Sequence, residues 1–135
     1  MNGIIPIRAS SVAELFDCPA RWEAKNLLGM RLPSSAAACL GTAIHASTGA
    51  FDESHLPGGN QLTADDAAGV LVDAIYTPAD DVAWDELTQS TAEKIGLSLH
   101  ARYCADIAPQ QEYIGVELKC EVLEITDLGI VLTGT

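Results

Sequence analysis

The chain has 135 residues and a mass of 14.2 kDa, a length that suits a single domain. Apolar residues make up 48 % and charged residues 19 %, so a packed core is expected and wholesale disorder is excluded. Seven Lys and Arg stand against 19 Asp and Glu, which gives a net charge of −12 and a pI near 4.3. This balance excludes nucleic-acid binding through a broad basic face and a polybasic membrane anchor. It is compatible with an enzyme that binds phosphates through bound metal cations.

The chain shows no targeting or membrane-spanning segment. Residues 1–8 lack a basic start followed by an apolar run and a small-residue cleavage site. The most apolar window, residues 36–50, is shorter than the ~18 residues that a membrane span requires. We therefore expect a cytoplasmic protein without membrane contact.

Four cysteines occur, at Cys18, Cys39, Cys104 and Cys120, and none forms a Cys-x-x-Cys pair. In a chain without a signal peptide, we expect reduced thiols rather than disulfides. The spacing does not favour a complete zinc site.

The first elements are expected to be two short helices joined at a corner. Ser11-Val12-Ala13-Glu14 fits a capping box and predicts that a helix begins at Ser11. Pro19 lacks an N–H and disfavours helical backbone at Cys18, so it predicts a break and the first turn of a second helix. Gly29 is expected to stop that second helix.

Three further helices are predicted. The first is capped by Ser34 or Ser35 and runs to about Phe51, with Gly41 and His45 one turn apart. Gly41 predicts that another group approaches the helix closely there, or that the glycine is merely tolerated. The next helix starts after the cap Thr63 and ends at Thr77-Pro78, beyond a loop over residues 56–60.

The last predicted helix is long, running from about Leu87 to Ile107 and terminated by Pro109. Its residues at helical spacing are Ala92, Ile95, Leu99, Arg102 and Tyr103. The acidic stretch over residues 80–86 that precedes it is expected to be exposed.

The pattern changes after Pro109 to an alternation of apolar and polar residues. Residues Tyr113–Val122 alternate in this way and predict a strand with one buried face. A turn at Asp127–Gly129 and a second strand at Ile130–Thr133 complete a hairpin. Because a lone hairpin is marginal, we expect the chain to be a fragment of a longer protein, with an open strand edge that favours association.

Two residues are candidates for metal or acid–base chemistry. His45 lies on an apolar helix, where it is either a core histidine with a satisfied hydrogen bond or a metal ligand or acid–base group. Glu117 lies on the polar face of the predicted strand, which is either solvated or turned toward a cleft. Glu121 and Glu124 compete with Glu117 for that role.

Cys18 is a third candidate, either as a buried thiol at a helix corner or as one ligand of an iron–sulfur cluster. His55 and His100 have no visible companions and are predicted to be surface or packing residues. Trp22 and Trp84 are predicted to be packing anchors rather than platforms for stacked bases.

Three stretches occur in a recognisable order: residues 10–22 with the Cys-Pro-x-Arg corner, residues 40–45 with Gly-x-x-x-His, and Val116-Glu117 followed by residues 128–135. Together they resemble the PD-(D/E)XK nuclease superfamily, in its RecB-like branch, which includes phage recombination nucleases and CRISPR-associated exonucleases. In that branch a strand pair ends in Gly-x-x-Asp, and a strand with Asp/Glu-x-Lys follows. The resemblance covers the whole chain in order.

The resemblance implies roles for individual residues. His45 is similar to the helix histidine that contacts the metal, and Glu117 to the acidic residue on the strand before the metal-binding Asp. Arg21 is similar to the arginine of the corner and is a candidate for substrate binding. Cys18 is similar to the first cluster ligand in members that carry an iron–sulfur cluster.

The resemblance implies an α/β fold with α+β order: N-terminal helices followed by the first hairpin of a restriction-endonuclease-like mixed sheet. Residues 1–135 would form a single partial nuclease domain, with 1–109 mainly helical and 110–135 the start of the central sheet. The metal-binding Asp and the Asp/Glu-x-Lys motif would lie beyond residue 135. We therefore expect this chain to be inactive alone, because one His and one Glu hold Mg²⁺ poorly.

The implied function is the N-terminal part of a metal-dependent DNA nuclease that hydrolyses phosphodiester bonds in recombination, repair or phage DNA processing. Its cofactor would be Mg²⁺ or Mn²⁺, with an iron–sulfur cluster as an open option. DNA would bind to the complete protein, and a protein partner would be one source of a basic surface. The alternatives are a non-catalytic binding module on the same scaffold and an unrelated helical protein with a hairpin.

Overall fold

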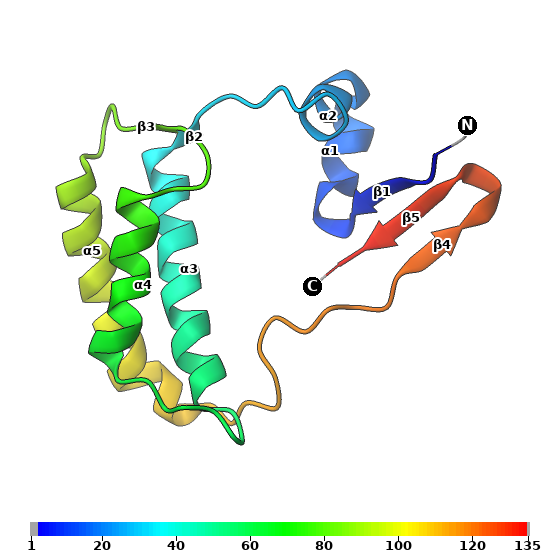
Figure 1. Cartoon of the computed structure of the whole chain (residues 1–135). Coiled ribbons are helices and arrows are strands. Elements are labelled where there is room, and N and C mark those ends of the chain that lie inside the picture. Colours follow the sequence, from blue (N-terminus) through cyan, green and yellow to red (C-terminus); the bar gives the residue numbers. More distant parts are fainter. Residues whose placement is uncertain (1–2, 135) are drawn as a thin grey trace. The chain divides into compact units, whose positions relative to one another are not determined.

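The computed structural model describes residues 3–134, and the chain divides into two compact units. The sheet unit comprises residues 1–31 and 117–135, and the helical unit comprises residues 32–116. The helical unit is thus inserted in sequence between two halves of the sheet unit. Helices and strands together make a mixed α/β structure of α+β character, as the sequence predicts (Figure 1).

The sheet unit is built around β5. In chain order its elements are β1 (Ile5–Arg8), α1 (Val12–Asp17), α2 (Pro19–Asn26), β4 (Leu123–Ile125) and β5 (Ile130–Thr133). In residues 3–31 and 117–134 the strand order is β1-β5-β4, with β1 parallel and β4 antiparallel to β5. Figure 1 shows β1 and β4 on opposite sides of β5. The buried side chains Ile7 and Trp22 give this unit its core.

The predicted turn and second strand of the hairpin are confirmed, but the predicted first strand is wrong. Residues 113–122, predicted as a strand, lie in coil, and only Leu123–Ile125 pair with β5. Alternation of apolar and polar residues suits a strand, but backbone hydrogen bonds to a neighbour are what form one. The turn is closed by Gly129, whose φ of 63° is available to glycine at little cost.

The helical corner forms where the sequence places it. Pro19 is the first residue of α2, and Gly29, with φ 67°, follows the end of that helix. The predicted capping box at Ser11 is wrong, because a 3₁₀ turn over Ala9–Ser11 precedes α1 and Ser11 makes no capping bond. Its hydroxyl is instead engaged with Arg8 and Trp22.

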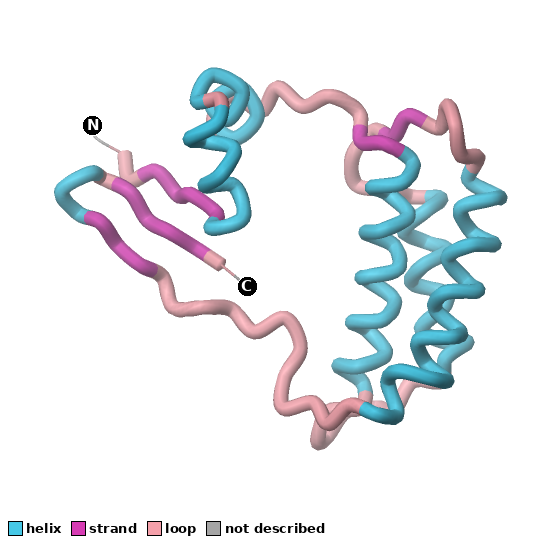
Figure 2. The backbone as a smooth tube through the Cα atoms, turned by 180° about the vertical axis from the view of Figure 1, so that it is seen from behind, coloured by secondary structure: helices cyan, strands magenta, loops and turns pink. Residues whose placement is uncertain are grey.

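The helical unit consists mainly of three helices that pack against one another. In chain order its elements are β2 (Ser34–Ser35), α3 (Ala36–Ser54), α4 (Ala64–Tyr76), β3 (Val82–Ala83) and α5 (Gln89–Arg102). A π-helical turn over Tyr103–Ile107 and a 3₁₀ turn over Ala108–Gln110 continue α5. Figures 1 and 2 show α3, α4 and α5 side by side from opposite directions.

Each of these helices begins at a hydroxyl cap. The side chains of Ser35, Thr63 and Thr88 accept hydrogen bonds from the backbone N–H three residues ahead, at Ala38, Asp66 and Thr91. Such caps satisfy N–H groups that the helix itself leaves without partners. The predicted starts of α3 and α4 are therefore confirmed together with their local cause.

The buried face of α5 includes only Ala92 of the residues that the sequence places at helical spacing. Ala92, Gly96 and His100 are buried, whereas Ile95 and Leu99 are 41 % and 48 % exposed. A Cβ at Gly96 would lie 3.0 Å from methyl groups of Leu71 and 3.1 Å from one of Leu40. Close packing of the backbone therefore selects the small-residue face of α5 over the face with larger apolar side chains.

A buried histidine links all three helices. His100 is 1 % exposed; its Nδ1 lies 3.0 Å from Ser47 Oγ on α3, and its Nε2 lies 3.0 Å from the Ala64 carbonyl oxygen on α4. A carbonyl only accepts, so Nε2 carries a proton and donates to Ala64. His100 is a packing residue, one of the two roles predicted for it.

The capping box of α4 is expected to make stability depend on pH. Asp66 Oδ2 accepts hydrogen bonds from Thr63 Oγ1 (2.6 Å) and Thr63 N (3.1 Å), and these bonds lower the pKa of Asp66. As the pH falls, Asp66 is therefore protonated in the unfolded chain before it is protonated in the folded chain. The stabilisation that charged Asp66 gives the folded chain is present at neutral pH and is lost as folded Asp66 becomes protonated.

We expect Asp66→Asn to unfold at lower urea than the wild type at pH 7, and the difference to shrink from about pH 5 to about pH 3. Asp65→Asn is the matched control, since exposed Asp65 carries the same charge outside the capping box. A constant difference between Asp66→Asn and the wild type across this range would contradict the role of the Asp66 charge.

Candidate functional site

The Cys-Pro corner joins α1 to α2 through the backbone of Cys18. Cys18 N donates to Glu14 O at 2.9 Å, and Trp22 N donates to Cys18 O at 3.0 Å. The thiol is half-buried, and the four cysteines of residues 3–134 are free. The corner thus forms as predicted, while the role of Cys18 as a cluster ligand stays a prediction.

Arg21 is held by two carboxylates of α1. Its Nε lies 3.2 Å from Glu14 Oε1 and its Nη2 lies 3.0 Å from Asp17 Oδ2. The hydrogen bond to Asp17 is the main cause that raises the pKa of Arg21. These exposed pairs brace the corner but contribute little to stability. The exposed guanidinium has further N–H donors besides those that bind Glu14 and Asp17, and substrate binding by Arg21 stays a prediction.

Trp22 connects the corner to the end of β1. Its indole is 4 % exposed, and Nε1–H donates to Ser11 Oγ at 3.0 Å. Ser11 Oγ in turn donates to the carbonyl oxygen of Arg8 at 2.9 Å. Trp22 is therefore a packing anchor, as predicted, and it fixes the backbone at Arg8.

His45 lies on an exposed part of α3, so the prediction of a core histidine is wrong. Gly41, one turn earlier, is also exposed, and apart from its chain neighbours and the adjacent backbone of α3, a Cβ there would meet no atom of residues 3–134 within 4 Å. The packing of the helical unit therefore does not require glycine at position 41. The role of His45 as a metal ligand stays a prediction.

Glu117 is exposed and stands outside any strand, with a φ of 50° that non-glycine residues rarely adopt. The strand predicted to carry it is not formed, and the same holds for Glu121, whereas Glu124 lies on β4. Glu117 belongs to the sheet unit and His45 to the helical unit. Their joint role in a metal site stays a prediction.

The residues present do not by themselves fit a bound metal. Within residues 3–134, no three His, Cys, Asp or Glu side chains are grouped so that they could hold a metal ion. Mg²⁺ takes near-octahedral oxygen ligation, which a single carboxylate and an imidazole do not complete.

No helix of residues 3–134 has the length and apolar character that crossing a membrane requires.

A cavity of about 610 Å³ lies at the carboxyl ends of β1 and β5 in the sheet unit. It is lined by Arg8, Ser10, Lys119 and Thr133, together with Ala9 and Gly134. Neither Arg8 nor Lys119 has an ion-pair partner among residues 3–134. Two cationic side chains beside exposed backbone and hydroxyl groups make a cavity suited to an anion such as a phosphate.

Charge is distributed unevenly between the units. Residues 32–116 contain two Lys or Arg and twelve Asp or Glu, a net charge of −10. Residues 1–31 and 117–135 contain five Lys or Arg and seven Asp or Glu, which gives a net charge of −2. A polyanion such as DNA is therefore repelled far less by the sheet unit than by the helical unit.

A family model for the PD-(D/E)XK nuclease superfamily matches residues 7–135. No significant match was found among curated proteins or among solved structures. The match spans nearly the whole chain, and the chain belongs to the PD-(D/E)XK nuclease superfamily. Membership implies a metal-dependent nuclease whose substrate is DNA.

Arg8 and Lys119 were not among the predicted site residues. The spacing Glu-x-Lys occurs at Glu117-Leu118-Lys119 and is the one signal in the sequence that points to Lys119. These three residues lie outside any strand, so they do not form the strand-borne motif of the family. Arg8 has no sequence signal, because its place in the cavity follows from the pairing of β1 with β5. Thr135, part of the predicted motif, lies outside the described residues.

Two glycines test which helix surfaces are closely packed. We expect Gly41→Ala to raise the free energy of unfolding by about 0.5–1 kcal/mol, because alanine favours helix and no neighbour obstructs its methyl group. We expect Gly96→Val to lower it by about 1–3 kcal/mol, because the added side chain collides with Leu71 and Leu40. Urea unfolding of the whole chain measures both. A loss of stability in Gly41→Ala would mean that this chain itself packs against position 41.

Proposed function

We propose that this chain is the N-terminal part of a metal-dependent DNA exonuclease in the RecB-like branch of the superfamily. It would act in recombination, repair or phage DNA processing. The family match over residues 7–135 carries this proposal. The elements that resemble the branch support it: the Cys18-Pro19 corner, the helix with Gly41 and His45, and the β4–β5 hairpin occur in the expected order.

We further propose that the metal-binding Asp and the strand with Asp/Glu-x-Lys follow residue 135 in the complete protein. Both outer strands of the sheet in residues 3–134, β1 and β4, have one edge without a paired strand. Large apolar side chains are exposed on and beside β4, at Val122, Leu123 and Leu128. Additional strands would use such edges and cover such side chains.

In this proposal His45 and Glu117 contribute to an Mg²⁺ or Mn²⁺ site that residues beyond 135 complete. Residues 1–135 alone would not cleave DNA, because one imidazole and one carboxylate leave most of the coordination shell to water. Cys18 would serve a cluster only together with cysteines outside this sequence or with Cys120 of the same unit.

We propose that DNA approaches the sheet unit, with Arg8 and Lys119 contacting its phosphates. The cavity at the ends of β1 and β5 and the concentration of cations in this unit support the proposal. Phosphate contacts of this kind position a duplex and do not read its sequence. A separate basic partner is an alternative source of such contacts.

The nuclease proposal is tested on the complete protein. We expect its gene to encode an Asp and an Asp/Glu-x-Lys strand beyond the codon for Thr135, and the protein to degrade linear DNA with Mg²⁺ or Mn²⁺. His45→Ala should lower the cleavage rate by about a hundredfold or more, the range for losing one group that stabilises charge. Circular dichroism and thermal melting should stay unchanged, since His45 is exposed.

His55→Ala is the control, because His55 is another exposed histidine of the helical unit. An unchanged rate in His45→Ala would exclude the ligand role. Cleavage by residues 1–135 alone would contradict the proposed place of the motif. A stop codon after Thr135 would favour the alternative, a non-catalytic binding module.

The DNA-contact proposal predicts a change in salt dependence. Arg8→Ala and Lys119→Ala should each weaken DNA binding by the complete protein and reduce the slope of log affinity against log salt by about 1. Lys94→Ala and Arg102→Ala remove the same charge from the helical unit and should leave the slope unchanged. Equal effects of all four substitutions would indicate general electrostatics rather than contacts at this cavity.

A further inference from the structure

A second cavity, of about 620 Å³, lies within the helical unit where α3 ends. Its wall is formed by the last turn of α3, the loop over residues 56–61 and the segment that follows the π-helical turn. The loop is tied to the helix by a hydrogen bond from Gln61 N to Ser54 O at 2.9 Å. A volume of this size is typical of cavities that hold small molecules.

Asp52 is the buried polar group of this cavity wall, with 7 % of its surface exposed. Its Oδ2 accepts a hydrogen bond from Tyr103 Oη at 2.5 Å. Its Oδ1 is buried and has no hydrogen-bond partner among residues 3–134. A buried carboxylate oxygen without a donor is energetically unfavourable.

The neighbouring hydroxyl groups cannot supply that donor. Tyr103 has one proton, which it gives to Asp52 Oδ2, so Tyr113 donates to Tyr103 across their 2.7 Å separation. Burial, followed by the hydrogen bond to Asp52, raises the pKa of Tyr103 and keeps it a donor. The two tyrosines thus hold the carboxylate in place and give Oδ1 no donor.

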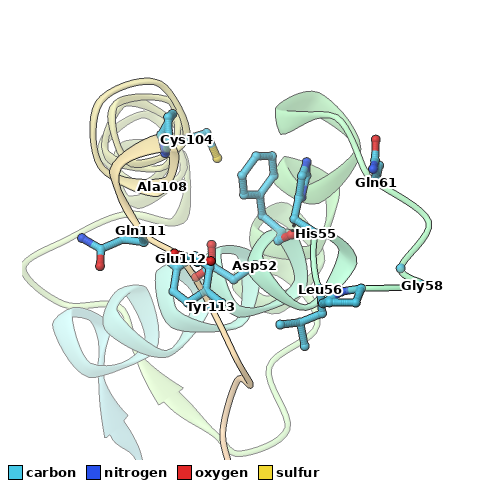
Figure 3. A pocket seen from close by; sticks show the side chains of 14 residues that line it. Asp52, His55, Leu56, Gly58, Gln61, Cys104, Ala108, Gln111, Glu112 and Tyr113 are labelled. Carbon is cyan, nitrogen blue, oxygen red and sulfur yellow. Dashed lines mark hydrogen bonds between the residues drawn. The ribbon is translucent and has the colours of Figure 1, made fainter.

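The other residues that line the cavity favour a cation that carries an apolar group. Glu112 adds a second carboxylate, and no Lys or Arg lines the cavity. Figure 3 shows Asp52, Glu112 and Tyr113 together on one side of it. Phe51 and His55, with ring centroids 4.3 Å apart, add aromatic surface. Aromatic faces beside a carboxylate attract organic cations.

We propose that this cavity binds a primary alkylammonium group beside the carboxylates of Asp52 and Glu112, with its alkyl part along the aromatic side chains. Its N–H donates to Asp52 Oδ1 when the Asp52 side chain turns this buried oxygen toward the cavity. A guanidinium fits less well, because it favours a carboxylate with both oxygens available and Oδ2 is taken by Tyr103. A metal ion is not favoured, since residues 3–134 contain no group of three ligands that could hold one.

A primary alkylammonium group is present in two kinds of ligand, a free small amine and the lysine side chain of another protein. The π-helical turn that carries Tyr103 and Cys104 into this region is a backbone form that is rare and often found at binding sites. The cavity is built entirely from residues 51–113, so its ligand does not depend on the proposed nuclease activity.

Isothermal titration calorimetry of the 135-residue chain tests the proposal with n-butylammonium, putrescine, Nα-acetyl-lysine amide and, as the uncharged control, n-butanol. We expect the ammonium compounds to bind and n-butanol not to bind. Asp52→Asn should weaken ammonium binding by roughly tenfold or more, since a charge-assisted hydrogen bond is lost. Glu53→Gln is the matched control, because adjacent Glu53 is exposed and does not line the cavity; it should change affinity less than about twofold.

A second measurement serves in case Asp52→Asn does not fold. Amide chemical shifts of the wild type should move at Asp52, Cys104 and Tyr113 when n-butylammonium is added. Tighter binding of the lysine amide than of the free amines would identify a protein ligand, and the reverse a small molecule. Absence of ammonium binding, equal binding of n-butanol, equal losses in Asp52→Asn and Glu53→Gln, or shifts spread over the acidic surface would overturn the proposal.

Discussion

The parallel pairing of β1 with β5 is the contact on which the sheet unit depends. It joins Ile5 to Ile130 and Arg8 to Thr133, residues that are separated by the entire helical unit in sequence. Without this pairing the β4–β5 hairpin would be a two-stranded ribbon of marginal stability. The same contact brings the backbone at Arg8 beside Thr133 and thereby forms the cationic cavity. Trp22 and Ser11 then anchor the α1–α2 corner to that end of β1.

Two histidines of the helical unit lie in very different surroundings. His100 is bonded at both ring nitrogens and connects α3 to the first residue of α4 from the last turn of α5. His45, which resembles the ligand of the nuclease family, stands on the exposed side of α3 beside an unobstructed Gly41. An imidazole with both nitrogens engaged in the core cannot bind a metal without breaking that core, whereas an exposed one can. Exposure thus makes His45, among these two, the histidine that is able to serve a site.

The negative charge of the chain is distributed unevenly between its two units. Most of the net charge belongs to the helical unit, and five of the seven cations belong to the sheet unit. A nuclease must bring a polyanion to its metal without repelling it elsewhere. In this chain the excess negative charge is concentrated in the helical unit, and the sheet unit has a net charge of only −2. The acidic helical unit is correspondingly suited to cations, as its cavity at Asp52 illustrates.

Local chemistry in the sequence determined where most helices begin and where the chain turns. Hydroxyl caps at Ser35 and Thr63 and the ring of Pro19 act within one helical turn of their own position, so their effect can be predicted without the fold. The order of the corner, the Gly41–His45 helix and the hairpin was likewise sufficient to indicate the nuclease superfamily that the family model confirms.

Tertiary structure alone decided the rest. Strand β1 exists because β5 pairs with it. Residues 113–122 alternate like a strand but form no ladder, although Cys120 N donates to Gly134 O at 3.0 Å, and Glu117 therefore lies in coil. The buried face of α5 is set by close contact at Gly96, not by the largest apolar residues. The orphaned oxygen of Asp52 likewise depends on where Tyr103 and Tyr113 meet it. Strand pairing, close packing and the pairing of hydrogen-bond donors with acceptors all depend on contacts between residues that are distant in sequence. A local sequence pattern does not predict such contacts.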